Sequence, residues 1–249
     1  MIKPLITVIT VTYNAGETIL RTLESVDNQT FDHYEHLIVD GASSDETLTH
    51  LENHPSQRRK IISERDAGLY DAMNKGLRMA EGDYVVFLNA GDKFHDRDTL
   101  ALVADAILEN DYPGVVYGQT DIVGPDGKRI GPRHLEAPEI LTVESFRNGM
   151  MVCHQAFFAL RKIAGDYNLK YHFSADYDWC IRVLQRSRRN FYVDAVVVDY
   201  LAEGMTTRNH RASLLERYRI MSHYYGWFGT TLRHMGFFFR DLRRKIAGR

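Results

Sequence analysis

Residues 5–13 read LITVITVTY, an unbroken run of β-branched and apolar side chains that stops at Asn14-Ala15-Gly16. Such a run is typical of a strand buried on both faces, as in a parallel sheet. Apolar residues then recur at helical spacing over residues 19–29, which predicts an amphipathic helix directly after the strand. This strand, turn and helix form the first unit of an α/β pattern.

The unit repeats through residue 110. Further strands are predicted at residues 35–40, 60–63 and 84–88, and helices from about residue 45, at 69–79 and at about 97–110. This alternation predicts a Rossmann-like α/β fold with a mostly parallel, doubly wound sheet flanked by helices. Ligands of such sheets bind beyond the carboxyl ends of the strands, so polar residues at those ends are the first candidates for a site.

The pattern changes after residue 113. Residues 114–123, followed by a Gly-Pro-Asp-Gly turn at 124–127, indicate a β-hairpin. The remaining segments are predicted as strands at 152–160 and 191–201, a helix at 174–186, and two helices at about 211–224 and 227–246. We expect one continuous α/β domain over residues 1–206 and a C-terminal helical extension over residues 207–249.

The composition is that of an ordinary globular protein, with 44% hydrophobic and 26% charged residues. Cys153 and Cys180 form neither a disulfide framework nor a metal-binding spacing, so both are expected to be buried thiols. The N-terminal residues do not resemble a signal peptide, and no run of 18 apolar residues predicts a transmembrane helix. These features predict a cytoplasmic protein.

The C-terminal extension is strongly basic, although the whole chain is not. Residues 207–249 hold ten Arg or Lys and two acidic residues, a net charge of +8, which leaves −10 for the rest of a chain whose formal net charge is −2. An apolar stripe at alternating spacings of four and three residues runs through Phe228, Leu232, Met235, Phe239, Leu242 and Ile246.

This combination favours a helix that lies on an anionic membrane surface, which would place the protein peripherally at the inner face of the plasma membrane. The alternative is that the stripe packs on the protein's own core or on a sister subunit. A nucleic-acid partner is not expected, because the aromatic side chains lie on the apolar stripe and not between the arginines.

Polar residues follow the second, third and fourth predicted strands. Asp40 closes the second strand and could accept a hydrogen bond from a base or a ribose, or simply cap the next helix. Arg65 and Asp66 lie at a loop-to-helix junction, where Arg65 could meet a phosphate. Asn89 and Asp92 end the fourth strand, where the Asp92 carboxylate could hold a hard cation or merely form a turn.

A second pair of carboxylates begins the helix predicted at 174–186. Asp176 and Asp178 are two positions apart, about 200° around the helix, so they cannot both face one pocket. Asp178 lies four residues before Arg182, a favourable ion-pair spacing that makes it structural. Asp176 is then the candidate general base, kept ionised by the helix N-terminus, or a carboxylate that only stabilises the helix dipole.

Three further residues are weaker candidates for binding the acceptor or the diphosphate. His154 and Gln155 lie inside the apolar strand predicted at 152–160, where a buried histidine is more often a hydrogen-bonded core residue than a catalyst. His210 lies beside Arg208 and Arg211 and could reach a metal or a diphosphate.

In this order, these segments resemble family 2 glycosyltransferases with the GT-A fold. ITVITVTYNAGETILRTLESVDNQTF resembles the family's first strand and helix, and VDGASSDET resembles its nucleotide-binding loop. SERDAGLYDAMNKGLRMAEGDYVVFLNAGD, CHQAFF, SADYDW and EGMTT are similar to the bacterial exopolysaccharide subgroup of the colanic acid, WcaE-like kind. The resemblance covers about residues 4–210.

The resemblance implies an inverting transfer from a UDP- or GDP-sugar that is bound with Mn²⁺ or Mg²⁺. A lipid-linked glycan is the expected acceptor, because the basic, amphipathic tail favours a membrane surface. The resemblance also implies three groups of site residues. The nucleotide would be bound by Thr12, Tyr13, Asn14, Asp40, Asp66 and Asn89, the metal by Asp92 in the motif that it shares with Asn89, and the catalytic base would be Asp176. Arg65 joins the nucleotide group through its position at the helix start.

One departure bears on the metal. The usual motif is Asp-x-Asp, and here Asn89 and Gly91 fill those two places, which leaves Asp92 as the acid of the segment. Two other functions compete with a glycosyltransferase: a catalytically weak nucleotide-sugar-binding protein, and a nucleotidyltransferase on the same sheet. The second would require a glycine-rich phosphate loop with a nearby lysine after the first strand, and residues 13–17 (YNAGE) supply neither.

Overall fold

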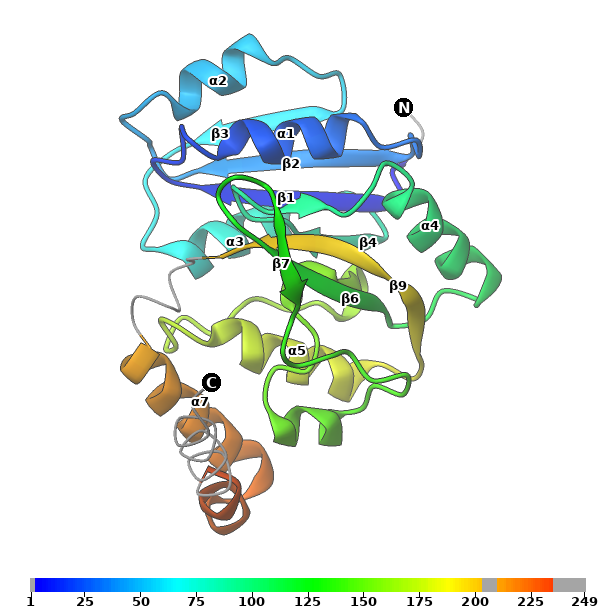
Figure 1. The fold of residues 1–249 in the computed structure, drawn as a ribbon, viewed down its shortest axis with the longest axis vertical. Coiled ribbons are helices and arrows are strands. Elements are labelled where there is room, and N and C mark those ends of the chain that lie inside the picture. Colours follow the sequence, from blue (N-terminus) through cyan, green and yellow to red (C-terminus); the bar gives the residue numbers. More distant parts are fainter. Residues whose placement is uncertain (1–2, 203–209, 235–249) are drawn as a thin grey trace.

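The computed structural model describes residues 3–202 and 210–234, with side chains from residue 212 onward in the second part. Its strands are β1 Ile6–Thr12, β2 Tyr34–Asp40, β3 Arg59–Ser63, β4 Tyr84–Phe87, β5 Lys93–Phe94, β6 Val115–Val123, β7 Arg129–Pro132, β8 Phe157–Leu160 and β9 Asn190–Leu201. Its α-helices are α1 Ile19–Asp27, α2 Thr47–Asn53, α3 Leu69–Met79, α4 Thr99–Glu109, α5 Ala175–Arg186 and α7 His210–Tyr225 (Figure 1). Three short 3₁₀ turns cover Val143–Asn148, His154–Ala156 and Arg161–Ile163.

All strands belong to one nine-stranded sheet in the order β3-β2-β1-β4-β8-β6-β9-β5, with β7 paired to β6. Strands β3, β2, β1 and β4 are parallel, as the first half of the sequence predicts. The second half makes the sheet mixed, because β8 runs antiparallel to both β4 and β6, while β6 and β9 are again parallel. The predicted hairpin is present as the antiparallel pair β6 and β7.

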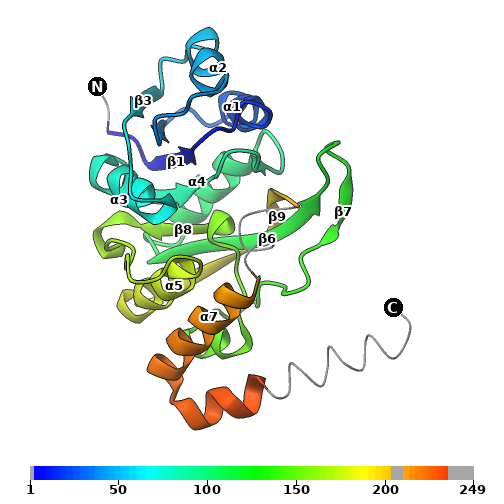
Figure 2. The ribbon, with the colours of Figure 1, turned by 90° about the vertical axis from the view of Figure 1, so that its left-hand side faces the viewer.

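Helices cover the parallel half on both faces, as expected of a doubly wound sheet. Alternate residues of β2 face opposite sides: Ile38 packs with Ile19, Leu23 and Leu51 under α1 and α2, whereas its neighbours belong to the main core. Figure 2 shows α3 and α5 along one side of the sheet, with α1 on the other.

Helix α3 lies unusually close to β1. A Cβ atom placed on Gly76 would be 2.5 Å from Cγ2 of Ile9, so only glycine permits this approach. Further along the core, Trp179 of α5 stacks on Tyr167 with ring centroids 5.1 Å apart and packs edge-on against Phe87 of β4. The aromatic contacts tie α5 to the parallel strands, which places the first turn of α5 beside their carboxyl ends.

The strand predicted at 152–160 is wrong in its first half. Only Phe157–Leu160 is extended, and His154–Ala156 forms a 3₁₀ turn in which the Ala156 N–H donates to the Cys153 carbonyl at 2.9 Å. The Gln155 side chain is held by Asp92 and Cys153, contacts that an alternating strand would not provide together. Because the residues around His154 and Gln155 are apolar, the sequence pattern predicts a strand here and does not indicate the turn.

Helix α7 packs on the domain. Ile220 and Met221 of α7 are buried and join the main core. A further helical segment covers residues 227–234, in which Phe228 and Leu232 of the predicted stripe are 64% and 55% exposed. The other four stripe residues, Met235 to Ile246, lie outside the described residues. Within the described part of the chain, no helix is long and apolar enough to cross a membrane.

Candidate functional site

A cavity of about 1920 Å³ opens at the carboxyl ends of β1, β2 and β4 and extends to α5 and α7. The structure brings most of the sequence-predicted residues to its wall: Thr12, Tyr13, Asn14, Arg65, Asp66, Asn89, Asp92, His154, Gln155 and Asp176. His210 lies at the start of α7, and its side chain is outside the described part. We call this cavity the cleft.

One end of the cleft is formed by the loops after β1 and β2, which are linked by hydrogen bonds. The Asn14 N–H donates to Ser43 Oγ at 2.8 Å, and Asn14 Oδ1 accepts the Ser44 N–H at 2.9 Å. This double link holds Asn14 at a φ of +48°, a value that asparagine tolerates better than most residues. Beside it, the Tyr13 ring is 66% exposed, so it is free to meet a planar ligand.

Asp40 does not line the cleft. Its side chain is fully buried, and its carboxylate accepts hydrogen bonds from the Ser43 N–H at 3.0 Å and from the hydroxyls of Ser43 and Ser63 at 2.5 and 2.6 Å. In this structure Asp40 therefore shapes residues 41–44, the loop that carries the links to Asn14. Asp40 does not cap α2, which begins at Thr47, and its contacts are with Ser43 and Ser63.

Arg65 and Asp66 form the next part of the wall. Asp66 Oδ1 accepts the Gly68 N–H at 2.8 Å just before α3, where Gly68 takes a φ of +119°. A Cβ on Gly41 would lie 2.7 Å from Asp66 Oδ2, so glycine at that position lets the two loops meet. The Arg65 side chain is exposed, and within the described residues its guanidinium forms no ion pair.

Asp92 lies at the floor of the cleft and is 4% exposed. Its Oδ1 accepts the Leu201 N–H at 2.9 Å, and its Oδ2 accepts Gln155 Nε2 at 2.8 Å. Burial raises the pKa of the Asp92 carboxyl to about 6, against the opposing effect of these two donors. The carboxylate is thus mostly ionised at neutral pH, and a bound cation would favour that form.

Asn89 offers a second oxygen close by. Its Oδ1 is buried and has no hydrogen-bond partner among the described residues, while its Nδ2 lies 3.4 Å from Nε2 of His154. A buried amide oxygen without a partner costs free energy unless a ligand satisfies it. Amide and carboxylate oxygens are both ligands for Mg²⁺ and Mn²⁺. The segment 89–92 therefore fits a weak divalent-cation site that needs further oxygens from a ligand.

Asp176 lies in the first turn of α5 and faces the cleft. Its Oδ1 accepts the Tyr70 hydroxyl at 3.2 Å, and its Oδ2 is 3.4 Å from His154 Nδ1. Burial alone would raise the pKa of Asp176, but the hydrogen bond and charge of His154, together with the charge of Arg217, outweigh it and hold the pKa below its usual range. An ionised carboxylate is the form that a general base needs.

Asp178 faces away from Asp176, as the helical spacing predicts. Its Oδ2 accepts Arg182 Nε at 2.7 Å, which confirms the expected ion pair, and its Oδ1 accepts the Tyr224 hydroxyl of α7 at 2.8 Å. Asp178 is 3% exposed and joins two helices. Its role in the described structure is to hold α7 against α5.

Several cleft residues were not among the candidates from sequence. Tyr70 lies within a segment that resembles the glycosyltransferase family. Its contact with Asp176 spans 106 positions of the sequence, and no local pattern predicts it. In the sequence Arg217 is one of the ten basic residues of the C-terminal extension and has no pattern of its own. The apolar part of the wall was also missed: Leu135, Met150, Leu214 and Met221.

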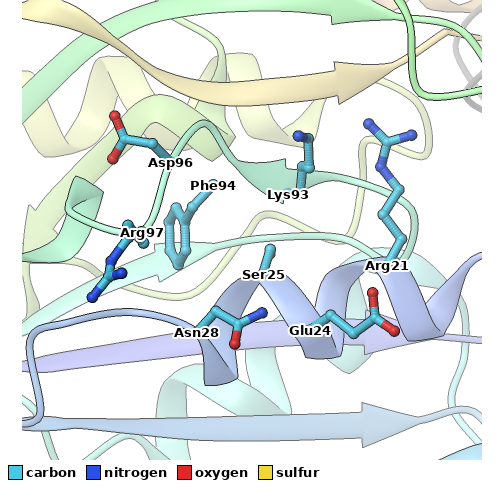
Figure 3. Close-up of a pocket in the computed structure, with 8 residues that line it drawn as sticks. All are labelled: Arg21, Glu24, Ser25, Asn28, Lys93, Phe94, Asp96 and Arg97. Atoms are coloured by element: carbon cyan, nitrogen blue, oxygen red, sulfur yellow. The ribbon is translucent and has the colours of Figure 1, made fainter.

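Two other features lie apart from the cleft. A hollow of about 580 Å³ lies between α1 and residues 93–97, and Figure 3 shows Arg21 and Lys93 side by side in it, with Asp96 and Arg97 at the other end. No sequence-predicted site residue lines this hollow. Ligand atoms of His95, Asp121 and Asp199 lie within 4.8 Å of one another and could hold a metal ion.

This His95 group is already neutralised by its own neighbours. Lys93 Nζ is 3.0 Å from Asp199 Oδ2, and Arg129 Nε is 2.5 Å from Asp121 Oδ2. A cation would have to displace both of these partners. No residue of the group lines the cleft.

Comparison with known proteins identifies the class. Residues 7–166 match the family described as Glycosyl transferase family 2. A "PGL/p-HBAD biosynthesis glycosyltransferase" of Mycobacterium bovis is 34% identical over 208 residues, which cover 80% of this chain and 78% of that protein. The chain therefore belongs to glycosyltransferase family 2.

Solved structures show the same fold. S. aureus TarS 1–349 superimposes with a TM-score of 0.70 at 18% identity, over 93% of this chain and 72% of that one. Its complex with UDP-GlcNAc gives 0.68 at 21% identity, over 87% and 64%. The mannosyltransferase PcManGT of Pyrobaculum calidifontis, in complex with GDP-Man and Mn²⁺, gives 0.64 at 18% identity, over 93% and 74%. The fold is GT-A, as the resemblance in the sequence implied.

Proposed function

We propose that this protein is an inverting glycosyltransferase that moves a sugar from a nucleoside diphosphate donor to an acceptor hydroxyl. The observation that carries the proposal is Asp176, an ionised carboxylate that faces a large cleft between Tyr70 and His154. Asp176 accepts the proton of the acceptor hydroxyl as the oxygen attacks the anomeric carbon. A single displacement on the face opposite the diphosphate inverts the configuration.

The loops after β1, β2 and β3 form the donor end of the cleft. The exposed Tyr13 ring offers a stacking surface for the base, and Asn14 and Thr12 flank it. Arg65 supplies a guanidinium that forms no ion pair within the part of the chain that the structure describes. Asp40 contributes by fixing the loop at residues 41–44. A UDP- or GDP-sugar is the proposed donor, which is supported by the complexes of S. aureus TarS with UDP-GlcNAc and of PcManGT with GDP-Man.

Asp92 and the unpartnered Asn89 oxygen would hold a Mn²⁺ or Mg²⁺ ion, with the donor's phosphates supplying further oxygens. When bound, the ion neutralises charge on the departing nucleoside diphosphate. The protein's own part is to keep Asp92 oriented, through the Leu201 N–H and the Gln155 amide. The Mn²⁺ in the PcManGT complex supports this proposal.

The remaining cleft residues, the relatives and the basic C-terminus support proposals for the acceptor and for the cellular location of the enzyme. His154 and Gln155 lie between the cation site and Asp176, where they can contact the diphosphate or the acceptor, and His210 is proposed for the same role. The M. bovis relative is named a PGL/p-HBAD biosynthesis glycosyltransferase, which supports a role in bacterial glycan synthesis, and the WcaE-like exopolysaccharide kind remains part of the proposal. A lipid-linked acceptor then suits a cytoplasmic enzyme whose basic C-terminus lies on the inner membrane surface.

Donor hydrolysis tests the proposal without knowledge of the acceptor. Purified protein is incubated with a panel of UDP- and GDP-sugars, with Mn²⁺ or with EDTA, and the released nucleoside diphosphate is measured. Slow, metal-dependent release from one donor is expected. Binding of UDP or GDP by calorimetry without release from any donor would instead support a nucleotide-sugar-binding protein, which the Asn89 and Gly91 departure from Asp-x-Asp favours as the second candidate.

A further inference from the structure

Helix α7 forms the wall of the cleft farthest from the donor loops. Leu214, Arg217 and Met221 from successive turns of α7 line it. Figure 1 shows α7 next to α5 at one end of the molecule and α2 and β3 at the other, with the sheet between them. The part of the cleft at α7 therefore lies on the acceptor side of Asp176.

The position of α7 is fixed by Glu216, the residue before Arg217. The Glu216 carboxylate accepts the backbone N–H groups of His172, Phe173 and Ser174 at 2.8, 2.8 and 3.1 Å. These donors immediately precede α5, which carries Asp176. Because Glu216 is committed to the N-terminus of α5, it does not neutralise its neighbour Arg217.

Within the described residues Arg217 forms no salt bridge, and its charge acts on Asp176 only from beyond ion-pair distance. It is half-buried, and its Nε is buried with no hydrogen-bond partner among the described residues. Its Cζ lies 5.9 Å from the centroid of the Tyr177 ring, and no carboxylate of the described residues lies within ion-pair distance. A buried guanidinium N–H that is left unpaired costs free energy, so this position is complementary to an anion.

The neighbouring cleft arginine is different. Arg133 Nη1 donates to the carbonyl of Leu135 at 3.0 Å, so that side chain is engaged by its own loop. The cleft wall also includes the apolar side chains of Leu135, Met150, Leu214 and Met221, alongside the polar side chains of His134, Asn148, His172 and His234. Arg217 therefore offers a guanidinium with no ion-pair partner among the described residues, on the same helix as the apolar side chains of Leu214 and Met221.

We propose that Arg217 binds a phosphate of the acceptor, so that the enzyme takes a sugar linked through a phosphate or diphosphate to an apolar chain. The inference rests on the proposed function, which places the acceptor hydroxyl at Asp176. The phosphate meets the Arg217 guanidinium, the apolar chain lies along Leu214 and Met221, and the sugar hydroxyl reaches Asp176.

The test uses matched acceptors that differ in one group. For each of several monosaccharides, an octyl glycoside is compared with the same sugar linked to octyl through a diphosphate, and with a methyl diphosphate version. Transfer is measured for the full-length wild type, Arg217→Gln and Arg217→Lys. Donor hydrolysis and calorimetric UDP binding are measured for each protein, so that failure of the proposed transferase activity is recognised separately.

We expect the wild type to prefer the octyl diphosphate acceptor. Arg217→Gln should raise KM for both diphosphate acceptors by about tenfold or more, the usual effect of losing a charge-assisted hydrogen bond, and change KM for the octyl glycoside less than about twofold. Arg217→Lys should restore part of the loss. The control Arg219→Gln, an exposed position on the same helix that does not line the cleft, should change none of these values.

Three results would overturn the proposal. If the wild type does not prefer the diphosphate acceptors to the octyl glycoside, the enzyme does not recognise a phosphate of the acceptor. Loss of UDP binding or of donor hydrolysis in Arg217→Gln would assign Arg217 to the donor's diphosphate. An equal loss of kcat with charged and neutral acceptors, together with an acid limb of the pH–rate profile shifted to higher pH, would mean that Arg217 acts only through the charge of Asp176.

Discussion

The Glu216 carboxylate of α7 accepts the backbone N–H of Ser174 at 3.1 Å, so that a residue of the C-terminal helix caps the helix that carries Asp176. The side chains reinforce the contact, because Ser174 Oγ lies 3.1 Å from Ser213 Oγ. Three backbone donors at a helix N-terminus are satisfied by one charged group, which also interacts favourably with the helix dipole. Helix α7 therefore belongs to the machinery that orients Asp176.

Replacing Glu216 should affect catalysis as well as stability. Glu216→Ala leaves three backbone N–H groups without their acceptor and should lower the free energy of unfolding by about 2–3 kcal/mol. Glu216→Gln keeps one acceptor oxygen and should lose about half as much, with kcat reduced more than the donor KM. Denaturant unfolding and steady-state kinetics measure both effects, with Glu109→Gln at an exposed site as the control. Unchanged kcat in a folded Glu216→Ala would refute the orienting role.

Removing the partner of a proposed metal ligand should weaken metal binding. Gln155→Leu deletes the donor to Asp92 Oδ2, and losses of this kind usually cost about 10–100-fold in metal affinity. The Mn²⁺ concentration for half-maximal donor hydrolysis should rise by that factor while the activity at saturating Mn²⁺ is largely kept. Cys153→Ala, which removes only the thiol that donates to Gln155 Oε1, should have a much smaller effect. An unchanged Mn²⁺ requirement in Gln155→Leu would argue against a cation at Asp92.

Asp176→Asn should separate binding from chemistry. The amide cannot accept the acceptor's proton, and loss of general-base catalysis typically costs about 10²–10⁴-fold in rate. We expect kcat for transfer to fall at least a hundredfold, while UDP binding by calorimetry stays the same. The matched variant Asp178→Asn breaks the pair with Arg182 and should lower stability more than kcat. Equal turnover in Asp176→Asn would remove Asp176 from this role.

The pKa of Asp176 adds a pH criterion. Its pKa is held below its usual range, so the carboxylate loses its negative charge only as the pH falls through that low value. The basic form is present throughout the range from about pH 5 to 8. If the transfer rate falls as the pH drops just below neutral, the group that takes up the proton must be one other than Asp176. A fall in rate that the wild type shows and only Asp176→Asn lacks would contradict the low pKa of Asp176.

The sequence predicts the parallel half of the fold well because each strand and helix there has its own local pattern. LITVITVTY consists of β-branched and apolar residues, as β1 is buried along its whole length, and α3 begins and ends where the periodicity predicts. The same local reasoning fails at His154 and Gln155, where the conformation depends on Asp92 more than 60 positions away. Asp40 shows a different limit of local reasoning. The sequence places it correctly at the end of β2, but the strand pattern does not predict its hydrogen bonds with Ser43 and Ser63.

Long-range contacts also explain the missed cleft residues. Arg217 has the same local surroundings as the other basic residues of its segment, and only the packing of α7 on α5 distinguishes it. Tyr70 looks like an ordinary core aromatic of an amphipathic helix until α5 brings Asp176 to its hydroxyl. Such roles follow from the tertiary arrangement, which no spacing in the sequence encodes.

A buried histidine in the sheet should make the fold sensitive to acid. His36 of β2 is 1% exposed and its Nε2 is 2.9 Å from Thr10 Oγ1; burial, together with the charge of Arg59, lowers its pKa to about 3. At pH values below about 6.5, the ordinary pKa of histidine, His36 binds a proton in the unfolded chain but stays neutral in the folded chain. The free energy of unfolding therefore falls as the pH falls through this window. From pH 7 to pH 5 the loss from His36 is about 2 kcal/mol.

His36→Gln should flatten the pH dependence of the unfolding free energy by that amount, whereas His33→Gln, on a side chain that is 58% exposed, should leave it unchanged. Parallel pH dependences for the wild type and His36→Gln would show that His36 is protonated equally in the folded and unfolded chains.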